Sequence, residues 1–268
     1  MNVIKSKNYI IQYVIYTYLL FGLLLFTLGG IATVIFHGTP LVMRWLIAIT
    51  AWTSTYVLLL MFKKIYPDST VRFFYKKAFN VKLNFRLLIT TTIIQTIIFV
   101  SSVYMISIHR NVTIINLLDL SFSTIMSALF FTLIQGPAGE ESGWRGYLLP
   151  EIEKKIGIVK SSLVVSLIWS FWHAPIWFLD TGYHGIVLIK YITVFVICIT
   201  SLGFIIGICF HICKNLFIPI WIHFLFNFFG ETYISSKVEL VAWYALFYFI
   251  VAIGFFLWHK RVGILSNK

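Results

Sequence analysis

Long apolar stretches separated by short polar ones run along most of this chain. A helix that spans a bilayer needs about 20 predominantly apolar residues. On that criterion the sequence predicts a single transmembrane domain over residues 1–268 with eight transmembrane helices. The predicted spans are residues 9–36, 41–62, 86–108, 119–149, 159–179, 186–210, 215–233 and 240–258.

Composition agrees with this pattern, because 60% of the 268 residues are hydrophobic and only 11% are charged. An ordinary soluble domain has about 25% charged residues. The predicted fold class is therefore an all-α, polytopic bundle of a multi-pass integral membrane protein. The short connections contain no Ser/Pro/Gly-rich linker, which predicts a membrane domain without a soluble appendage.

The net charge of +12 would suggest a nucleic-acid partner in a soluble protein, but here the positions of the charges matter more than their sum. Most of the 21 lysines and arginines fall on the side of the chain termini, which predicts that both termini are cytoplasmic. Seven of them lie between residues 63 and 86, a segment that we expect to lie along anionic headgroups. The expected partners therefore include membrane lipids and exclude nucleic acid.

Ionisable side chains inside a membrane span are costly unless they are paired or hydrated, so they are candidates for function. Few occur in the predicted spans. They lie in the fourth, fifth and seventh spans, where the candidate site residues are Glu140, Glu141, Arg145, His173, His223 and Asn227.

The spacing of these residues predicts their relations. Glu141 and Arg145 are four residues apart, so they share a helical face and can pair. Glu140 points about 100° away from Glu141, and two adjacent carboxylates in an apolar site push their proton affinities apart. Glu140 is therefore the candidate general base. His223 and Asn227 are also four apart and could direct two hydrogen-bond donors at one oxyanion.

Depth in the membrane tests whether these residues can meet. At 1.5 Å per residue, His173 lies about 20 Å and His223 about 13 Å from the cytoplasmic end of its helix. Glu140 reaches a similar depth, about 15 Å, only if the span 119–149 continues past a kink at residues 136–139. We therefore expect an extended, kinked helix and a polar cavity that is reached from the cytoplasm.

Three stretches of the sequence resemble the ordered motifs of the CPBP family, also called the Abi family. That family contains CAAX prenyl endopeptidases and proteins of bacteriocin processing or immunity. The motifs fall within a predicted catalytic core, residues 117–233. The second motif of the family commonly begins with Phe, where this chain has Trp169, so that aromatic packing is preserved. The motifs here are Glu-Glu-Ser-Gly-Trp-Arg-Gly-Tyr-Leu-Leu-Pro (140–150), Trp-Ser-Phe-Trp-His-Ala-Pro (169–175) and His-Phe-Leu-Phe-Asn (223–227).

The resemblance implies an intramembrane endopeptidase with a cavity that faces the cytoplasm. By position, Glu140 would activate water and His173 would assist or position it. The histidine and asparagine of the third motif would stabilise the oxyanion, while Glu141 and Arg145 support the site. The expected substrate is a peptide or protein, membrane-proximal, lipidated or secreted, and the expected location is the cell membrane of a microbe.

The choice between a metal-free site and a zinc site is open from the sequence. Glu140, His173 and His223 could supply three zinc ligands and leave a fourth position for water. The chain has no H-E-x-x-H helix, and Asn227 is a poor zinc ligand. We therefore favour water activated by a glutamate without a cofactor, with zinc as the alternative.

Two further classes of function remain alternatives to a protease. Chains of carboxylates and histidines also serve as proton relays in transporters, although the sequence shows no inverted repeat of the kind common in transporters. A non-catalytic immunity or scaffold protein could keep the same residues for structure.

Overall fold

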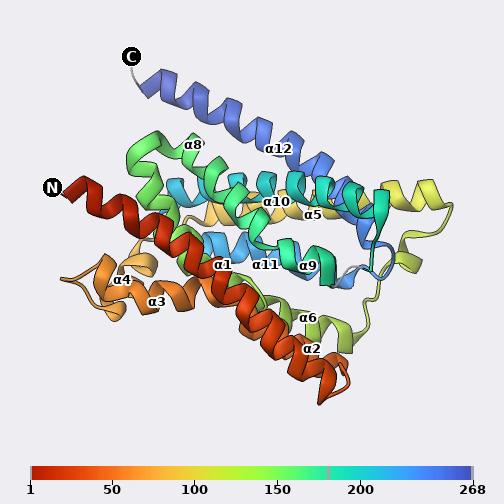
Figure 1. Ribbon diagram of the computed structural model, residues 1–268. Coiled ribbons are helices and arrows are strands. Elements are labelled where there is room, and N and C mark those ends of the chain that lie inside the picture. The colour runs from red at the N-terminus through yellow and green to blue at the C-terminus, as the bar shows by residue number, and fades with distance from the viewer. Residues whose placement is uncertain (1, 180–181, 267–268) are drawn as a thin grey trace.

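The computed structural model describes residues 2–179 and 182–266, which form a bundle of helices (Figure 1). Within these residues no β-strand forms, and the one isolated bridge joins Leu118 and Tyr233. The helices are α1 (Asn2–Val34), α2 (Pro40–Ala51), α3 (Thr53–Ile65), α4 (Val71–Asn80), α5 (Phe85–Arg110), α6 (Phe122–Ile134), α7 (Pro137–Gly143), α8 (Leu149–Trp172), α9 (Ala174–Leu179), α10 (Gly185–Cys213), α11 (Phe217–Thr232) and α12 (Lys237–Ser266), with a 3₁₀ turn η1 (Ile114–Leu117) and a π-helix η2 (Trp144–Leu148).

Six helical segments of the described chain are long and apolar enough to cross a membrane. Many large apolar side chains on α1, α5 and α12 are exposed, as expected of helices that face lipid. The predicted fold class, a polytopic helical membrane bundle, is confirmed. The count of eight and the orientation of the termini stay predictions. The six segments are Tyr9–Val34, Pro40–Ile65, Phe85–Arg110, Phe122–Phe178, Gly185–Cys213 and Lys237–Arg261.

The difference between six segments and eight predicted spans has two sources. The segment Phe122–Phe178 is continuous by length, but Gly157 interrupts α8 with a φ of 73°, a conformation that favours glycine. This break lies between the predicted spans 119–149 and 159–179. The other source is α11, which has 16 residues and is shorter than a full span.

Helix α10 forms the centre of the bundle, and its second half, from Cys198, is almost entirely buried. It packs closely against α8, because Gly203 and Gly207 face the side chains of Ser166 and Ser162. Small residues at such a crossing let two helix backbones approach each other, which is a common way to pack helices in membranes. At the same crossing, an added Cβ on Gly203 would lie 3.1 Å from Nη2 of Arg145, so α8 and α10 meet beside the first motif.

The expected kinked helix after residue 119 is present, in three parts. Helix α6 ends at Ile134, α7 begins at Pro137, and α7 continues directly into η2 and α8. Proline is favoured in the first turn of a helix because its missing N–H needs no partner there. The π-helix was not predicted from the sequence, and it carries Arg145.

Candidate active site

Three polar atoms from two helices meet around Gly136, at the break between α6 and α7. A Cβ atom on Gly136 would lie 3.0 Å from Nδ2 of Asn227, 3.1 Å from Nε2 of His223 and 3.2 Å from Oε1 of Glu140. Helices α7 and α11 therefore direct these atoms at one point, which is open because Gly136 has no side chain. A water or carbonyl oxygen at that point would be within about hydrogen-bond distance of all three atoms.

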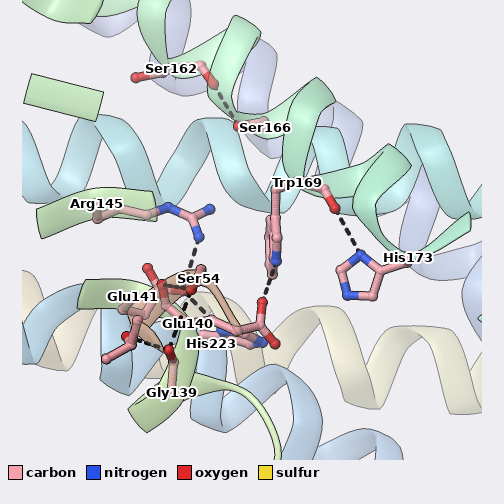
Figure 2. A network of polar contacts seen from close by, with 11 residues as sticks. Ser54, Gly139, Glu140, Glu141, Arg145, Ser162, Ser166, Trp169, His173 and His223 are labelled. Carbon is pink, nitrogen blue, oxygen red and sulfur yellow. Dashed lines mark hydrogen bonds and ion pairs between the residues drawn. The ribbon is translucent and has the colours of Figure 1, made fainter. Parts of the chain in front are cut away.

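Glu140 is buried, with 3% of its surface exposed, and both ends of the residue are held (Figure 2). Its Oε2 accepts a hydrogen bond from the indole Nε1 of Trp169 at 2.5 Å, so Oε1 is the oxygen directed at Gly136. Its backbone carbonyl accepts a hydrogen bond from the hydroxyl of Ser54 at 3.0 Å. Helix α8 thus holds the carboxylate of Glu140, and helix α3 holds its backbone.

Glu141 binds two partners through one oxygen. Its Oε1 accepts hydrogen bonds from Nη1 of Arg145 and from Nδ1 of His223, each at 2.9 Å. The predicted pair of Glu141 and Arg145 is present, and its contact with His223 is an additional link. Because a carboxylate only accepts hydrogen bonds, the Nδ1 of His223 carries a hydrogen, and its Nε2 is the nitrogen near Gly136.

Trp169 is the residue that joins the separate parts of the site. Besides its bond to Glu140, its ring lies under the guanidinium of Arg145, with Cζ 4.4 Å from the ring centroid. Both histidine rings contact it edge to face, with centroid distances of 5.7 Å for His173 and 5.0 Å for His223. The buried charge of Arg145 is therefore met by a carboxylate on one side and an aromatic face on the other.

His173 lies at the end of α8, on the wall of the site. Its Nδ1 is 2.8 Å from the carbonyl oxygen of Trp169, so Nδ1 is the donor and Nε2 is left as the acceptor in the neutral ring. It is not among the three atoms nearest to an added Cβ on Gly136, but it lines the same cavities as Glu140. The six predicted residues thus surround one site, with His173 at its side.

Two cavities adjoin Glu140 and His173. One, of about 240 Å³, is lined mostly by apolar side chains of α1 and α2, such as Leu25 and Leu46. The other, of about 250 Å³, also contains His223 and Asn227. Each cavity is large enough to hold water molecules or part of a substrate next to the carboxylate of Glu140.

A third cavity, of about 280 Å³, extends from Asn227 to Glu231 and Lys237 at the end of α11. There Glu231 pairs with Arg44 of α2 at 2.5 Å. This end of the bundle is opposite the chain termini (Figure 1). A cavity that opens at this end faces the cytoplasm only if the connection between α11 and α12 is cytoplasmic. The charge distribution predicts the opposite orientation, with the termini in the cytoplasm.

The zinc alternative was tested on the arrangement of its three ligands. In the part of the chain that the structure describes, no group of three His, Cys, Asp or Glu side chains is placed to hold a metal ion. Both histidines direct Nδ1 at another protein group, which leaves Nε2 as the nitrogen that could bind a metal, so the ring orientations by themselves do not argue against zinc. It is the spacing of Glu140, His173 and His223 that does not group them as three zinc ligands.

The part that two residues play in the candidate site was missed from the sequence. Trp169 was assigned to aromatic packing, yet it is also the hydrogen-bond donor to Glu140. Gly136 was assigned to a kink, yet its missing side chain opens the point where three polar atoms meet. For Trp169, the sequence offered one signal, which is that an indole stands where the family commonly has Phe. No feature of the sequence distinguishes Gly136 from an ordinary glycine at a helix kink.

Comparisons with known proteins point to the same region. Residues 122–229 match the model of a family described as type II CAAX prenyl endopeptidase Rce1-like. The chain is 30% identical over 147 residues to the CAAX prenyl protease 2 of Methanococcus maripaludis. That match covers 53% of this chain and 54% of the relative, so the chain spans about half the length of the curated relative. All six candidate residues lie within residues 122–229, the region that matches the family model.

Proposed function

We propose that this chain is a membrane-embedded endopeptidase of the CAAX prenyl endopeptidase (CPBP) family, which the match over residues 122–229 and the similarity to the curated relative support. One observation carries the proposal: Glu140, His223 and Asn227 direct three polar atoms at the space beside Gly136. Acyl transfer to water needs a base for the water and donors for the oxyanion, and these three groups can supply both.

In the proposed reaction, Glu140 is the general base. Its Oε1 takes a proton from a water molecule while the water oxygen bonds to the carbonyl carbon of the substrate. Glu140 then returns the proton to the leaving nitrogen as the carbon–nitrogen bond breaks, so the products are a carboxylic acid and an amine. The bond from Trp169 to Oε2 supports this role, because it orients the other oxygen toward Gly136.

His223 and Asn227 donate hydrogen bonds to the oxyanion in this proposal. Since the Nδ1 hydrogen of His223 is used by Glu141, its Nε2 can donate only when the ring is an imidazolium. Glu141 stabilises that cation, and Arg145 holds the carboxylate in place. The positive charges of His223 and Arg145 then balance the negative charges of the two glutamates. A site without net charge suits a buried environment of low dielectric constant.

His173 is proposed to position the water or the leaving amine. It lines both cavities that adjoin Glu140, and its Nδ1 is fixed by the carbonyl of Trp169. The remaining nitrogen can accept a hydrogen bond from a water in the cavity. This is a supporting role, because atoms of Glu140, His223 and Asn227 are the ones nearest to the point beside Gly136.

The substrate class that we propose is a peptide with a lipidated cysteine near the scissile bond. The cavity between α1, α2 and Glu140 has largely apolar walls, which suit an apolar segment or an attached lipid chain. The curated relative is named as a CAAX prenyl protease, which agrees with such a substrate. A secreted peptide precursor would place an apolar segment in the same cavity.

The test uses purified protein in liposomes and a farnesylated peptide that ends in a CAAX sequence. We expect Glu140→Gln to abolish cleavage while the protein still inserts and melts at the wild-type temperature. Glu151→Gln is the matched control, since Glu151 pairs with Lys154 away from the site. Full activity of Glu140→Gln would overturn the proposal, and ion uptake without cleavage of any peptide would favour a transporter.

The metal-free mechanism has its own test. We expect cleavage to persist after dialysis against a strong zinc chelator, because no described set of ligands fits zinc. Loss of cleavage that added zinc restores would instead support the zinc-dependent version of the same protease.

A further inference from the structure

Helix α4 is a short helix at the end of the bundle where the chain termini lie (Figure 1). Its inner face carries Phe74, Tyr75 and Ala78, which are half-buried, at the spacing of one helical face. Its outer face is exposed and combines basic with aromatic side chains. The exposed residues are Val71, Arg72, Phe73, Lys76, Lys77, Phe79 and Asn80.

The inner face of α4 contacts the helix that carries both glutamates. The hydroxyl of Tyr75 donates a hydrogen bond to Oγ of Ser142 at 3.2 Å, and Ser142 directly follows Glu141. Gly146 of η2 lies one helical turn after Ser142, and the ring of Phe74 packs against it. A Cβ atom added to Gly146 would lie 3.1 Å from Cζ of Phe74. The position of α4 is thereby transmitted to α7 and η2 by direct contact.

The C-terminal end of α4 contacts the start of the other catalytic helix. The carbonyl of Ala78 accepts a hydrogen bond from the backbone N–H of Leu216 at 2.9 Å, at the first turn of α11. The amide Nδ2 of Asn215 donates to the carbonyls of Phe79 at 3.3 Å and Val81 at 2.6 Å. Helix α4 therefore bridges α7, which carries Glu140, and α11, which carries His223.

The outer face and its flanks have the chemistry of a membrane surface element. Between residues 63 and 86 the only acidic side chain is Asp68, against seven basic ones, and all seven are exposed. Exposed Phe73, Phe79 and Phe85 stand among these cations. Basic groups attract anionic lipid headgroups, and aromatic rings favour the boundary between headgroups and acyl chains. The basic residues are Lys63, Lys64, Arg72, Lys76, Lys77, Lys82 and Arg86.

We propose that α4 is a binding surface for anionic lipid headgroups, and that a bound headgroup holds α7 and α11 at the separation that the active site needs. The lipid-binding part stands on the charge and exposure of α4 alone. The effect on hydrolysis rests on the function proposed above, because it acts through Ser142 and Leu216 on the helices of Glu140 and His223.

The first experiment measures lipid binding without reference to activity. Native mass spectrometry counts the phosphatidylglycerol molecules that the purified protein retains. We expect the triple variant Arg72→Gln/Lys76→Gln/Lys77→Gln to lose retained lipid, by about fivefold for each residue removed. The matched control is Lys154→Gln/Lys155→Gln/Lys160→Gln, which removes the same charge from exposed positions of α8. An equal loss in the control, or no loss in the α4 variant, overturns the proposal.

The second experiment measures cleavage of the farnesylated peptide in vesicles of phosphatidylcholine alone and of phosphatidylcholine with phosphatidylglycerol. We expect the wild type and the α8 control to gain activity with phosphatidylglycerol and the α4 triple variant to gain none. Tyr75→Phe is expected to retain lipid like the wild type but to lose most of the gain, because it lacks the bond to Ser142.

The two proposals fail in different ways. If no vesicle supports cleavage, the proposed function fails, while lipid retention still decides whether α4 binds anionic headgroups. If cleavage occurs but is the same in both kinds of vesicle for the wild type, the coupling of α4 to the site is wrong and the endopeptidase function stands.

Discussion

Glu141 and Trp169 each contact two other residues of the candidate site and so link groups that would otherwise be separate. Glu141 binds Arg145 and His223 through the same oxygen, and Trp169 binds Glu140 while it lies against Arg145. In the proposed reaction such a network would orient the reacting atoms before substrate arrives, so we expect its members to act as a unit.

Trp169→Phe keeps the aromatic ring and removes the N–H that binds Glu140. A hydrogen bond to a charged group contributes about 1.5–3 kcal/mol, so we expect kcat to fall about 10- to 150-fold with little change in KM. The melting temperature should also fall somewhat, since the smaller ring fills less of the buried space of the indole. Unchanged kcat would mean that this bond does not orient the base.

Gly136→Ala places a methyl group at the point where three polar atoms meet. Because a shift of about 1 Å in an active site can cost about 100-fold in rate, we expect kcat/KM to fall by at least that factor. Gly22→Ala is the matched control, since nothing lies within 4 Å of its added Cβ. Near-normal activity of Gly136→Ala in a cleavage assay would show that the reaction occurs elsewhere.

Helix packing decides how close α8, η2 and α10 come to one another. At Gly203 an added Cβ would lie 2.5 Å from Oγ of Ser166 and 3.1 Å from Nη2 of Arg145. The site thus depends on a glycine of α10 that lies outside all three motifs. Helix α10 reaches the candidate site near Arg145, which pairs with Glu141, and through Phe195, whose ring contacts His173.

Gly203→Ala is expected to destabilise the fold by about 1–3 kcal/mol through overpacking. In a protein of this size each kcal/mol lowers the melting temperature by about 2–4 °C. The double variant Gly203→Ala/Ser166→Gly should recover part of the loss, because the clashing side chain is removed. Thermal unfolding in detergent measures both, and purely additive losses would contradict the contact between these helices.

The whole molecule has two chemically different ends. The end with the termini and α4 is strongly basic, whereas the other end bears the cavity that reaches Glu231 and Lys237. Two expectations from the sequence, cytoplasmic termini and a cytoplasm-facing cavity, refer to these opposite ends. The positive-inside rule acts during insertion and favours the basic end in the cytoplasm.

We therefore expect Asn80→Cys, on α4, to be protected from a membrane-impermeant maleimide in intact cells, and Thr113→Cys to be labelled. Both positions are exposed and lie at opposite ends of the bundle, and the three native cysteines are buried. The reverse pattern would place the cavity mouth in the cytoplasm and the termini outside. Labelling after the cells are opened checks that both cysteines react.

The sequence by itself determined the features that depend on local composition and spacing. Apolar stretches determine a helical membrane protein, because the bilayer leaves backbone groups no partners except one another. The four-residue spacing of Glu141 and Arg145 determines their pair, because side chains one turn apart face each other. The candidate residues themselves were predicted from charge in an apolar context and from the motif resemblance.

Only the tertiary structure decided which atoms meet. Glu141 binds His223, 82 positions away, and Trp169 binds Glu140 across 29 positions, and no local pattern encodes such contacts. The opening at Gly136 depends on how α7 and α11 pack, as does the bridge that α4 forms between them. Spacing fixes neighbours within one helix, whereas contacts between helices follow from the shapes of the surfaces that pack together.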